Sequence, residues 1–303
     1  MLRLSLYLLL ILSNFPVLAE TLSEPVSTEQ LTMTEIDVQF RPRYSPWSLS
    51  YFNWATQPVD KTDEGKARLS TYNYLSINYR LNGGMFSIRP TFFINGSGYD
   101  EFENEVVESD IELGDIYLQY SKYNVALLPG GIGLTGALRI YLPQAKYAKE
   151  QGKISELRGK FYFSKPWGYG WNTTYMLEPR YAFFRERGYF TEFNNVAANR
   201  YAVLWHYLEQ AKLFNQRYGL SAQVGMKHYY YYDFPSEGLQ NRIEDYAEAA
   251  MYFLFNLNGV NIKAGVMQSR NIRHPNGKYE PGGGLSLFKK EESKISIMTS
   301  FRL

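Results

Sequence analysis

Apolar and polar residues alternate along most of this chain, and the alternation continues to its last residue. The final segment alternates between two sets of residues, one formed by Ile295, Ile297, Thr299, Phe301 and Leu303 and the other by Ser296, Met298, Ser300 and Arg302. A period of two residues is that of a β-strand, whose successive side chains point to opposite faces. Terminal residues of soluble domains tend to fray. A last strand with one apolar face is instead typical of a transmembrane β-barrel, in which one face meets lipid and the other the lumen.

The same rhythm predicts twelve strands, in each of which one parity is apolar and the other is polar or small. The predicted strands are 46–56, 68–80, 85–95, 113–121, 131–142, 155–164, 170–184, 199–213, 218–230, 245–256, 260–269 and the last ten residues. In the strand 199–213 we assign Tyr201, Val203, Trp205 and Tyr207 to the lipid side, which turns His206 toward the lumen. The predicted fold is all-β, a transmembrane antiparallel up-and-down β-barrel of about 12 strands.

The connections between these strands alternate in length, which supports the same topology. Short turns are predicted near Asn82-Gly83-Gly84, Tyr123-Asn124, Trp167-Gly168, Asn215-Gln216 and Asn258-Gly259, where several pairs allow the positive φ of tight hairpins. Longer connections fall at about 57–67, 96–110, 143–153, 185–197, 231–242 and 271–291. Short periplasmic turns and long extracellular loops are usual in barrels, so both termini are expected on the periplasmic side. An even number of strands leaves no unpaired edge in lipid.

Three residues do not fit the simple pattern. Pro90 and Pro179 fall inside predicted strands on the lipid-facing parity, where a proline removes a hydrogen bond of the ladder and can mark a bulge. Glu209 has the lipid-facing parity of its strand. We therefore expect that Glu209 lies near the periplasmic rim or that the register of this strand shifts.

The N-terminal region has no alternation and divides into two segments. Residues 1–19 read as a secretory signal peptide, with Arg3 before an apolar run and Val17-Leu18-Ala19 before a cleavage site. Residues 20–44 are expected to form a periplasmic tail or a plug of the lumen, and residues 45–303 the barrel. Without Arg3 the formal charge falls from +2 to +1, so the net charge does not suggest nucleic acid as a partner.

Composition agrees with a membrane barrel in its aromatic content. The chain has 27 Tyr, 19 Phe and 5 Trp, side chains that suit membrane interfaces. It has no cysteine, which excludes disulfides, thiol catalysis and Cys-ligated metal. The mean hydropathy of −0.36 would alone suggest a soluble protein, but only every second residue of a barrel strand faces lipid.

Taken together, the signal segment, the alternation, the loop asymmetry and the terminal strand resemble those of Gram-negative outer-membrane β-barrels, in particular the small porin-like channels. The resemblance covers roughly residues 45–303 and departs from the class in Leu303, where phenylalanine is commonest. It implies a location in the outer membrane. It also implies contact with outer-membrane lipid and lipopolysaccharide, handling by the barrel assembly machinery, a monomeric state and no cofactor.

The inward parity carries thirteen charged residues, nine basic and four acidic. The candidate pore-lining residues among them are Arg89, Asp115, Arg139, Glu156, Arg158, Lys160, Glu178, Arg180, Lys227, Glu248 and Lys263, and the other two are Arg80 and Arg200. Unpaired buried charges are costly, so these groups need water or partners. The first hypothesis is a passive channel for small hydrophilic solutes, with a mild preference for anions and a constriction at Arg89, Arg139, Arg158, Lys160, Arg180 and Lys227. The alternative is a plugged interior in which the charges pair and conduct nothing.

The histidines suggest a different function, an outer-membrane enzyme that acts on lipid or lipopolysaccharide. His206 shares the lumen parity with Ser221 and Gln223 of the next strand, whereas His228 has the other parity and His274 lies in the last long loop. A catalytic site requires the base within hydrogen-bond reach of the nucleophile, and no compact motif joins these residues. We therefore predict no catalytic residue and, because no ligand spacing is present, no metal site. A third alternative is a closed structural or adhesive barrel.

Three further segments each allow a functional interpretation and a purely structural one. Gly131 to Gly136 matches G-x-G-x-x-G, but a strand pattern follows it where a dinucleotide site needs a helix. The acidic run from Asp100 to Glu112 could bind divalent cations, although such a run is more often solvated surface. The run Tyr229 to Tyr232 could stack on sugars at a pore mouth or belong to an interfacial aromatic girdle.

Overall fold

The computed structural model describes residues 45–63, 66–99, 105–106, 109–190, 196–233, 242–257, 259–273 and 289–302. The predicted signal peptide, the segment 20–44, His274, Leu303 and most of the acidic run 100–112 lie outside the described residues. The domain boundaries drawn from the sequence therefore stay predictions. No helix among the described residues is long and apolar enough to cross a membrane.

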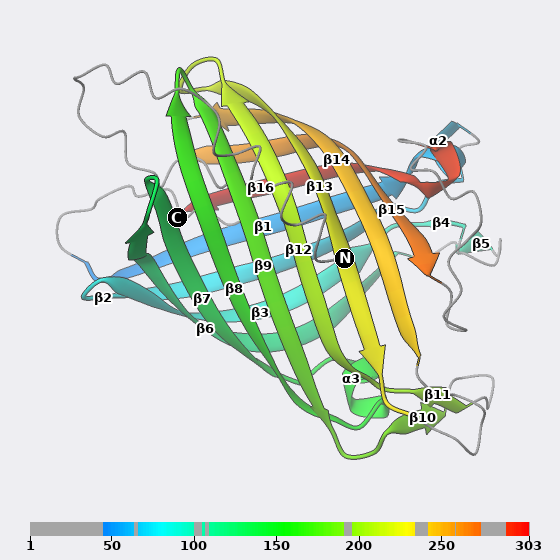
Figure 1. Cartoon of the computed structure of the whole chain (residues 1–303). Helices are drawn as coiled ribbons and strands as arrows, with labels where there is room; N and C mark the ends of the chain where they lie inside the picture. Colours follow the sequence, from blue (N-terminus) through cyan, green and yellow to red (C-terminus); the bar gives the residue numbers. More distant parts are fainter. Residues whose placement is uncertain are drawn as a thin grey trace.

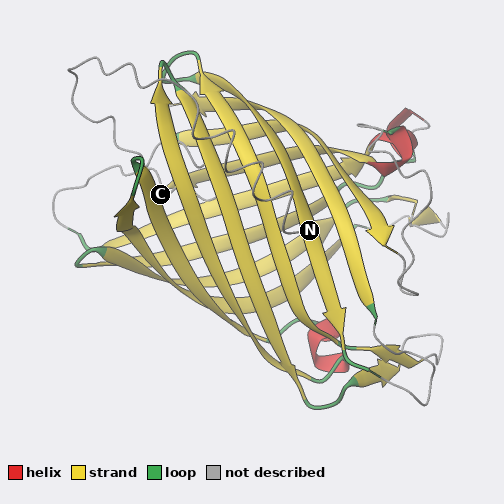
Figure 2. Cartoon of the chain, viewed as in Figure 1, coloured by secondary structure: helices red, strands yellow, loops and turns green. Residues whose placement is uncertain are grey.

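Twelve antiparallel strands form a closed barrel, as the alternation predicts (Figures 1 and 2). In chain order they are β1 (Trp47–Pro58), β2 (Ser70–Leu81), β3 (Gly84–Asn95), β6 (Asp110–Leu128), β7 (Ile132–Leu142), β8 (Lys153–Gly168), β9 (Trp171–Phe184), β12 (Arg200–Leu213), β13 (Tyr218–Tyr231), β14 (Ile243–Leu257), β15 (Val260–Arg273) and β16 (Ser293–Arg302). Neighbours in the sequence are neighbours in the sheet, and β16 closes the barrel by pairing with β1, Tyr51 lying opposite Phe301.

The two ends of the barrel differ in the length of their connections. At the short-turn end the strands are joined at residues 82–83, 129–131, 169–170, 214–217 and 258–259. This end also holds the start of β1 and the end of β16, which Figure 1 shows on its left. The long-loop end carries α2 (Val59–Asp63), α3 (Lys146–Glu150), η3 (Lys290–Glu292) and two small hairpins, β4 (Gly98–Tyr99) with β5 (Glu105–Val106) and β10 (Gly188–Phe190) with β11 (Val196–Ala198).

Two of the predicted turns lie a few residues too early. At Asn124, where φ is 51°, the chain does not reverse. Instead β6 continues through a register shift between Lys122 and Ala126, and the turn follows at Gly130 and Gly131, both with positive φ. Similarly, the pairing of β8 with β9 shifts its register between Pro166 and Gly168, where β8 ends, and the turn lies at residues 169–170. A left-handed residue can serve a bulge as well as a turn, so its position alone does not fix the hairpin.

Eleven of the twelve predicted strand orientations agree with the structure. Large apolar residues are exposed on the outer wall in these strands, and examples are Leu75, Ile88, Leu138, Phe161, Tyr181, Val224, Phe253 and Ile297. Such an apolar outer face is what a hydrocarbon environment would cover. The G-x-G-x-x-G segment belongs to this wall, because its residues from Ile132 onward are the start of strand β7 and not a loop that opens a helix.

The predicted orientation of the strand 199–213 is wrong. His206 of β12 lies opposite Met226 of β13 and Leu177 of β9, both of which face outward. Directly opposed residues share a face of the sheet, so His206 faces outward and Trp205, Tyr207 and Glu209 face the interior. The error arose because the aromatic parity was taken as the lipid side, whereas these rings fill the lumen.

The two prolines behave differently. The pairing of β3 with β6 shifts between Pro90 and Phe92, which confirms a bulge beside Pro90. Pro179 lies opposite Leu204 in an unbroken register, so no bulge accompanies it. Glu209 is only 3% exposed and faces inward, which removes the anomaly of a carboxylate on the lipid side.

Candidate functional site in the barrel interior

A central cavity of about 460 Å³ lies inside the barrel and has two chemically different sides. The first, which we call the cationic wall, carries Arg139 of β7, Arg158 and Lys160 of β8, Arg180 of β9 and Lys227 of β13. The second, the apolar wall, consists of Phe52 and Trp54 of β1, Tyr72 of β2, Phe93 of β3, Met267 of β15 and Met298 of β16. In the closed order of strands β7, β8 and β9 lie opposite β15, β16 and β1, so most of the two sets face each other.

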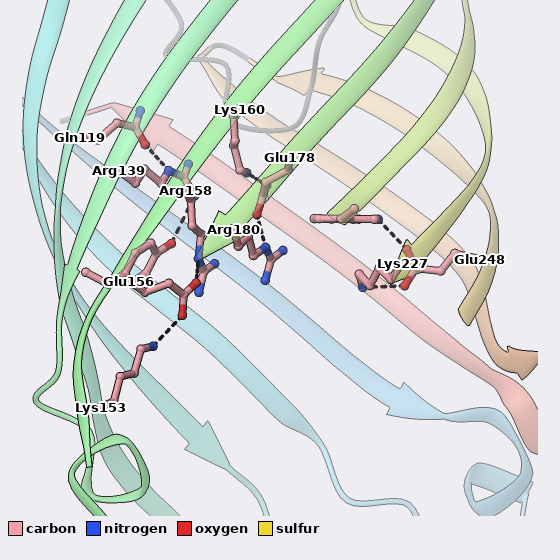
Figure 3. Close-up of polar contacts among 12 residues, drawn as sticks. Gln119, Arg139, Lys153, Glu156, Arg158, Lys160, Glu178, Arg180, Lys227 and Glu248 are labelled. Atoms are coloured by element: carbon pink, nitrogen blue, oxygen red, sulfur yellow. Dashed lines mark hydrogen bonds and ion pairs between the residues drawn. The ribbon is translucent and has the colours of Figure 1, made fainter. Parts of the chain in front are cut away.

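At the centre of the cationic wall, Glu178 forms ion pairs with two basic side chains (Figure 3). Its side chain is 0% exposed, and Oε1 lies 2.5 Å from Arg180 Nε while Oε2 lies 3.2 Å from Lys160 Nζ. The two basic side chains keep part of their surface exposed. The carboxylate thus holds both cations at the cavity surface without covering them.

A second ion-pair cluster lies toward the long-loop end. Glu156 pairs with Arg158 and, at 2.7 Å, with Lys153 Nζ (Figure 3). Lys153 Nζ also lies 3.4 Å from Asp115 Oδ2. Asp115 Oδ1 in turn accepts the backbone N–H groups of residues 144 and 145, just before α3. These contacts tie the start of β8 to β6 and to the α3 loop.

Trp205 links the cationic wall to β14. Its Nε1 donates to Glu248 Oε2 at 2.8 Å, and Lys227 Nζ lies 2.5 Å from Glu248 Oε1. Lys227 Nζ and Arg180 Cζ lie 4.4 and 5.4 Å from the Trp205 ring. Cations near an aromatic face are stabilised by its quadrupole, so the inward Trp205 supports the positive charge on both sides.

Two arginines of the wall pack against tyrosine rings. Arg158 lies 3.9 Å from the Tyr141 ring and Arg139 lies 4.9 Å from the Tyr117 ring, while the two rings stack at 4.6 Å. Arg139 Nε also donates to Gln119 Oε1 at 2.6 Å (Figure 3). The stacked rings support both guanidinium groups and stabilise their positive charge.

The charge of the cavity lining is positive. Five basic residues and three acidic ones, Asp115, Glu178 and Glu248, line it, which leaves two positive charges in excess. A narrow lumen with low-dielectric walls focuses such an excess, so anions would be favoured inside it.

The predicted pore-lining residues all point inward, but not all of them reach the central cavity. Arg89 is 2% exposed and packs beside Tyr74, with its Nε 2.9 Å from Ser76 Oγ. Lys263 is 1% exposed and pairs with Glu209 Oε1 at 2.7 Å. Both side chains are therefore part of the packed wall. Glu156 lines a second cavity, and Arg80 lies exposed beside the first short turn.

This second cavity, of about 250 Å³, lies at the long-loop end. Its lining includes Lys153, Glu156, Arg200, Tyr231, Arg242 and Tyr147 of α3. Arg158 and Arg180 line both cavities and lie opposite each other in the pairing of β8 with β9. Burial and a hydrogen bond with the Tyr189 hydroxyl raise the pKa of Tyr147 to about 12, so this phenol is neutral at ordinary pH.

Near the short-turn end, small polar side chains of the adjacent strands β1, β2 and β3 form a buried network. Asn78 Oδ1 accepts the hydroxyls of Ser76 and Ser87 at 2.6 and 2.7 Å, and Asn78 Nδ2 donates to Ser50 Oγ at 3.1 Å. All four side chains are buried. This network gives one side of the lumen a lining of small neutral groups.

His206 and His228 lie on the outer wall. The rings of His206 and His228 stack at 5.6 Å, and His228 Nδ1 lies 2.7 Å from Asp245 Oδ1. Ser221 faces the interior, so His206 and Ser221 lie on opposite faces of the sheet and not on the same one, as the predicted parity implied. Sequence reasoning missed this cluster because it assigned His206 to the lumen. Within the described ranges no group of three His, Cys, Asp or Glu residues could hold a metal ion.

The tyrosine run serves both sides of the wall. Tyr231 donates to Glu244 Oε2 at 2.9 Å, and the Tyr229 ring lies 4.5 Å from Arg200 Cζ, both in the interior. Tyr230 instead packs near Tyr201 at the outer rim. The run therefore does not lie on a single face, since adjacent residues of a strand point to opposite faces.

No protein-family model matches the sequence, and no curated protein matches it. Among solved structures, the COG4313 outer membrane channel from Pseudomonas putida F1 is similar with a TM-score of 0.56 and 9% identity, over 89% of this chain and 100% of that chain. LpxR from Salmonella typhimurium gives a TM-score of 0.40 at 10% identity, over 83% and 99% of the two chains. The Pseudomonas putida toluene transporter TodX gives 0.36 at 10%, over 87% and 90%. The chain thus has the fold of Gram-negative outer-membrane barrels, as the sequence predicts.

Proposed function

We propose that this protein is an outer-membrane channel through which small solutes diffuse passively, and that its interior favours anions. The observation that carries the proposal is the central cavity, whose lining has two positive charges in excess. Its fold is also that of a solved outer-membrane channel. With the short-turn end in the periplasm, a solute would enter from the long-loop end through the second cavity.

Arg158 and Arg180 are the residues that we assign to the selective step. Both line the two cavities, and each keeps about a fifth of its side chain exposed despite its ion pair. An anion can therefore reach the guanidinium groups without breaking the pairs with Glu156 and Glu178. Because the carboxylates neutralise much of the charge, the expected anion preference is modest.

The test is single-channel recording from the purified mature protein in planar bilayers, with different KCl concentrations on the two sides. We expect discrete conductance steps that grow with salt and a reversal potential displaced toward that of chloride. A membrane that stays silent at high protein concentration, or a reversal potential displaced toward potassium, would refute the proposal.

One observation favours a second function, an enzyme that acts on lipid or lipopolysaccharide. His206 and His228 face outward, where a lipid substrate would lie, and Asp245 holds His228 by its Nδ1. A histidine oriented by a carboxylate can act as a general base. However, in the part of the chain that the structure describes, neither histidine hydrogen-bonds a serine or threonine hydroxyl, so water would have to be the nucleophile.

The two functions make different predictions. Incubation with lipopolysaccharide or phospholipid vesicles, followed by mass spectrometry of the lipids, would detect released acyl chains. Hydrolysis that His228→Ala abolishes, in a protein that does not conduct, would favour the enzyme. Conductance without hydrolysis favours the channel, and silence in both assays favours a structural barrel.

A further inference from the structure

We propose that the solute preferred by the central cavity is an aromatic carboxylate, an organic anion with an apolar ring. Its carboxylate would lie on the cationic wall and its ring on the apolar wall. This inference rests on the proposed channel function and adds to it the class of solute. The sequence suggested only small hydrophilic solutes. The structure adds the apolar wall, which the alternation did not reveal.

The apolar wall is formed by side chains that already hold one another in place. Phe52 stacks on Tyr74 with ring centres 4.9 Å apart, and Phe93 packs against Tyr72 at 5.5 Å. Trp54 Nε1 donates to Ser296 Oγ at 2.8 Å, which satisfies its only polar atom. The wall therefore offers apolar surface to the cavity. Met267 and Met298 complete it with flexible side chains that adapt to different shapes.

Because a cationic wall and an apolar wall line the same cavity, we expect it to favour an amphipathic anion over a small hydrated anion or a neutral hydrocarbon. A small hydrated anion would gain from the arginines but would have to lose water against the apolar wall without compensation. A neutral hydrocarbon would bury its surface there but would also desolvate the cationic groups opposite. A carboxylate attached to a ring satisfies both walls at once, because the guanidinium forks bind carboxylate and the ring buries apolar area.

The cavity has a suitable size and depth for such a solute. Its volume of about 460 Å³ lies within the usual range of small-molecule sites. Arg139 and Arg158 are fixed by Tyr117 and Tyr141, so little side-chain freedom would be lost on binding. Lys160 of β8 and Met298 of β16 line this cavity from opposite strands, so a bound solute would lie between the two walls.

The test measures binding in detergent solution by isothermal titration calorimetry, which does not depend on conduction. Four probes separate the contributions: phenylacetate carries ring and charge, acetate only charge, 2-phenylethanol only a ring, and glucuronate charge with a hydroxylated ring. We expect phenylacetate to bind at least tenfold more tightly than each of the others. Equal affinities for phenylacetate and acetate, or tighter binding of glucuronate, would overturn the proposal.

Adjacent phenylalanines of β3 provide a matched pair of variants. Phe93 faces the cavity, whereas Phe92 has the opposite parity and lies beside Leu113 on the outer wall. We expect Phe93→Ser to weaken phenylacetate binding at least fivefold and to leave acetate unchanged, while Phe92→Ser changes neither. If Phe93→Ser does not fold, Met298→Gln on β16 tests the same wall. A loss that is the same in Phe92→Ser and Phe93→Ser would contradict the assignment.

Recording in KCl alone separates this inference from the channel proposal. Conductance without a preference for phenylacetate would support the channel function and refute the proposed class of solute. Tight phenylacetate binding without conductance would support the binding site and refute the channel function. In a conducting protein, millimolar phenylacetate should also reduce the chloride current more than acetate does.

Discussion

The two walls of the central cavity are stabilised by different interactions. On the cationic wall Glu178 and Glu248 hold Lys160, Arg180 and Lys227 by ion pairs, and the charges are fixed by direct contact. On the apolar wall rings pack against rings, as Phe93 does against Tyr72. The lumen of this barrel is therefore not uniformly polar. We expect the cationic wall to select solutes by charge and the apolar wall to select them by shape, so that mutations in one wall change one of these properties.

The largest expected effect comes from reversing charge on the cationic wall. Arg158→Glu combined with Lys160→Glu changes the cavity lining from five basic and three acidic residues to three basic and five acidic ones. We expect the reversal potential in a KCl gradient to change sign. The control is Lys146→Glu with Lys149→Glu, which makes the same charge change on exposed residues of α3. Unchanged selectivity in the first variant would show that these side chains do not border the ion path.

The next effect concerns the buried carboxylate that anchors the wall. Glu178→Gln leaves Lys160 and Arg180 without their shared partner while keeping the side-chain shape. We expect a loss of about 1–3 kcal/mol in the free energy of unfolding, reduced from the value for fully buried pairs because both cations are partly exposed. Urea unfolding of the protein in vesicles measures it.

The matched control for this variant is Glu150→Gln. Its partner Lys146 is exposed, so the change should be close to zero. Equal stability of the two variants would mean that Glu178 does not hold the cationic wall together. The Glu178→Gln channel should also show a stronger anion preference than the unaltered protein, since one negative charge is lost from the lining.

A smaller effect is expected on the apolar wall. Trp54→Phe keeps an aromatic ring but loses the hydrogen bond to Ser296. We expect a loss of about 0.5–1.5 kcal/mol in the free energy of unfolding and no change in ion selectivity. Bilayer recording and urea unfolding of the same preparation check both points. A change in selectivity would show that the two walls are not independent.

The smallest effect is expected outside the cavity. His206→Ala should alter neither conductance nor selectivity, because His206 faces outward beside Met226 and Leu177. Replacement of its neighbour Trp205 by Ala should alter both, since Trp205 contacts Lys227 and Glu248 in the interior. Single-channel recording of the two variants checks the orientation of β12. The opposite result would restore the orientation predicted from the sequence.

Much of the barrel could be predicted from the chain because alternation is a local property. Val224 faces outward as expected, and it is an apolar residue between Gln223 and Gly225. The same rule failed at β12, where Trp205 and Tyr207 have the apolar parity but fill the lumen. Glu209 carried the signal that could have corrected the error, because an unpaired carboxylate in lipid is costly. Its partner, Lys263, lies on a strand far along the chain.

The number of strands, the closed antiparallel topology and the inward parity of most charged residues could be predicted from the chain, because each depends on a period of two residues and on the lengths of connections. The ion pairs and the position of the apolar side of the lumen could not be predicted, because both depend on how the sheet closes. Closing the sheet brings β8 opposite β16 and β9 opposite β1, and contacts across a barrel have no fixed spacing in the sequence. For the same reason Arg89 and Lys263 are buried in the wall, while Arg158 and Arg180 border both cavities.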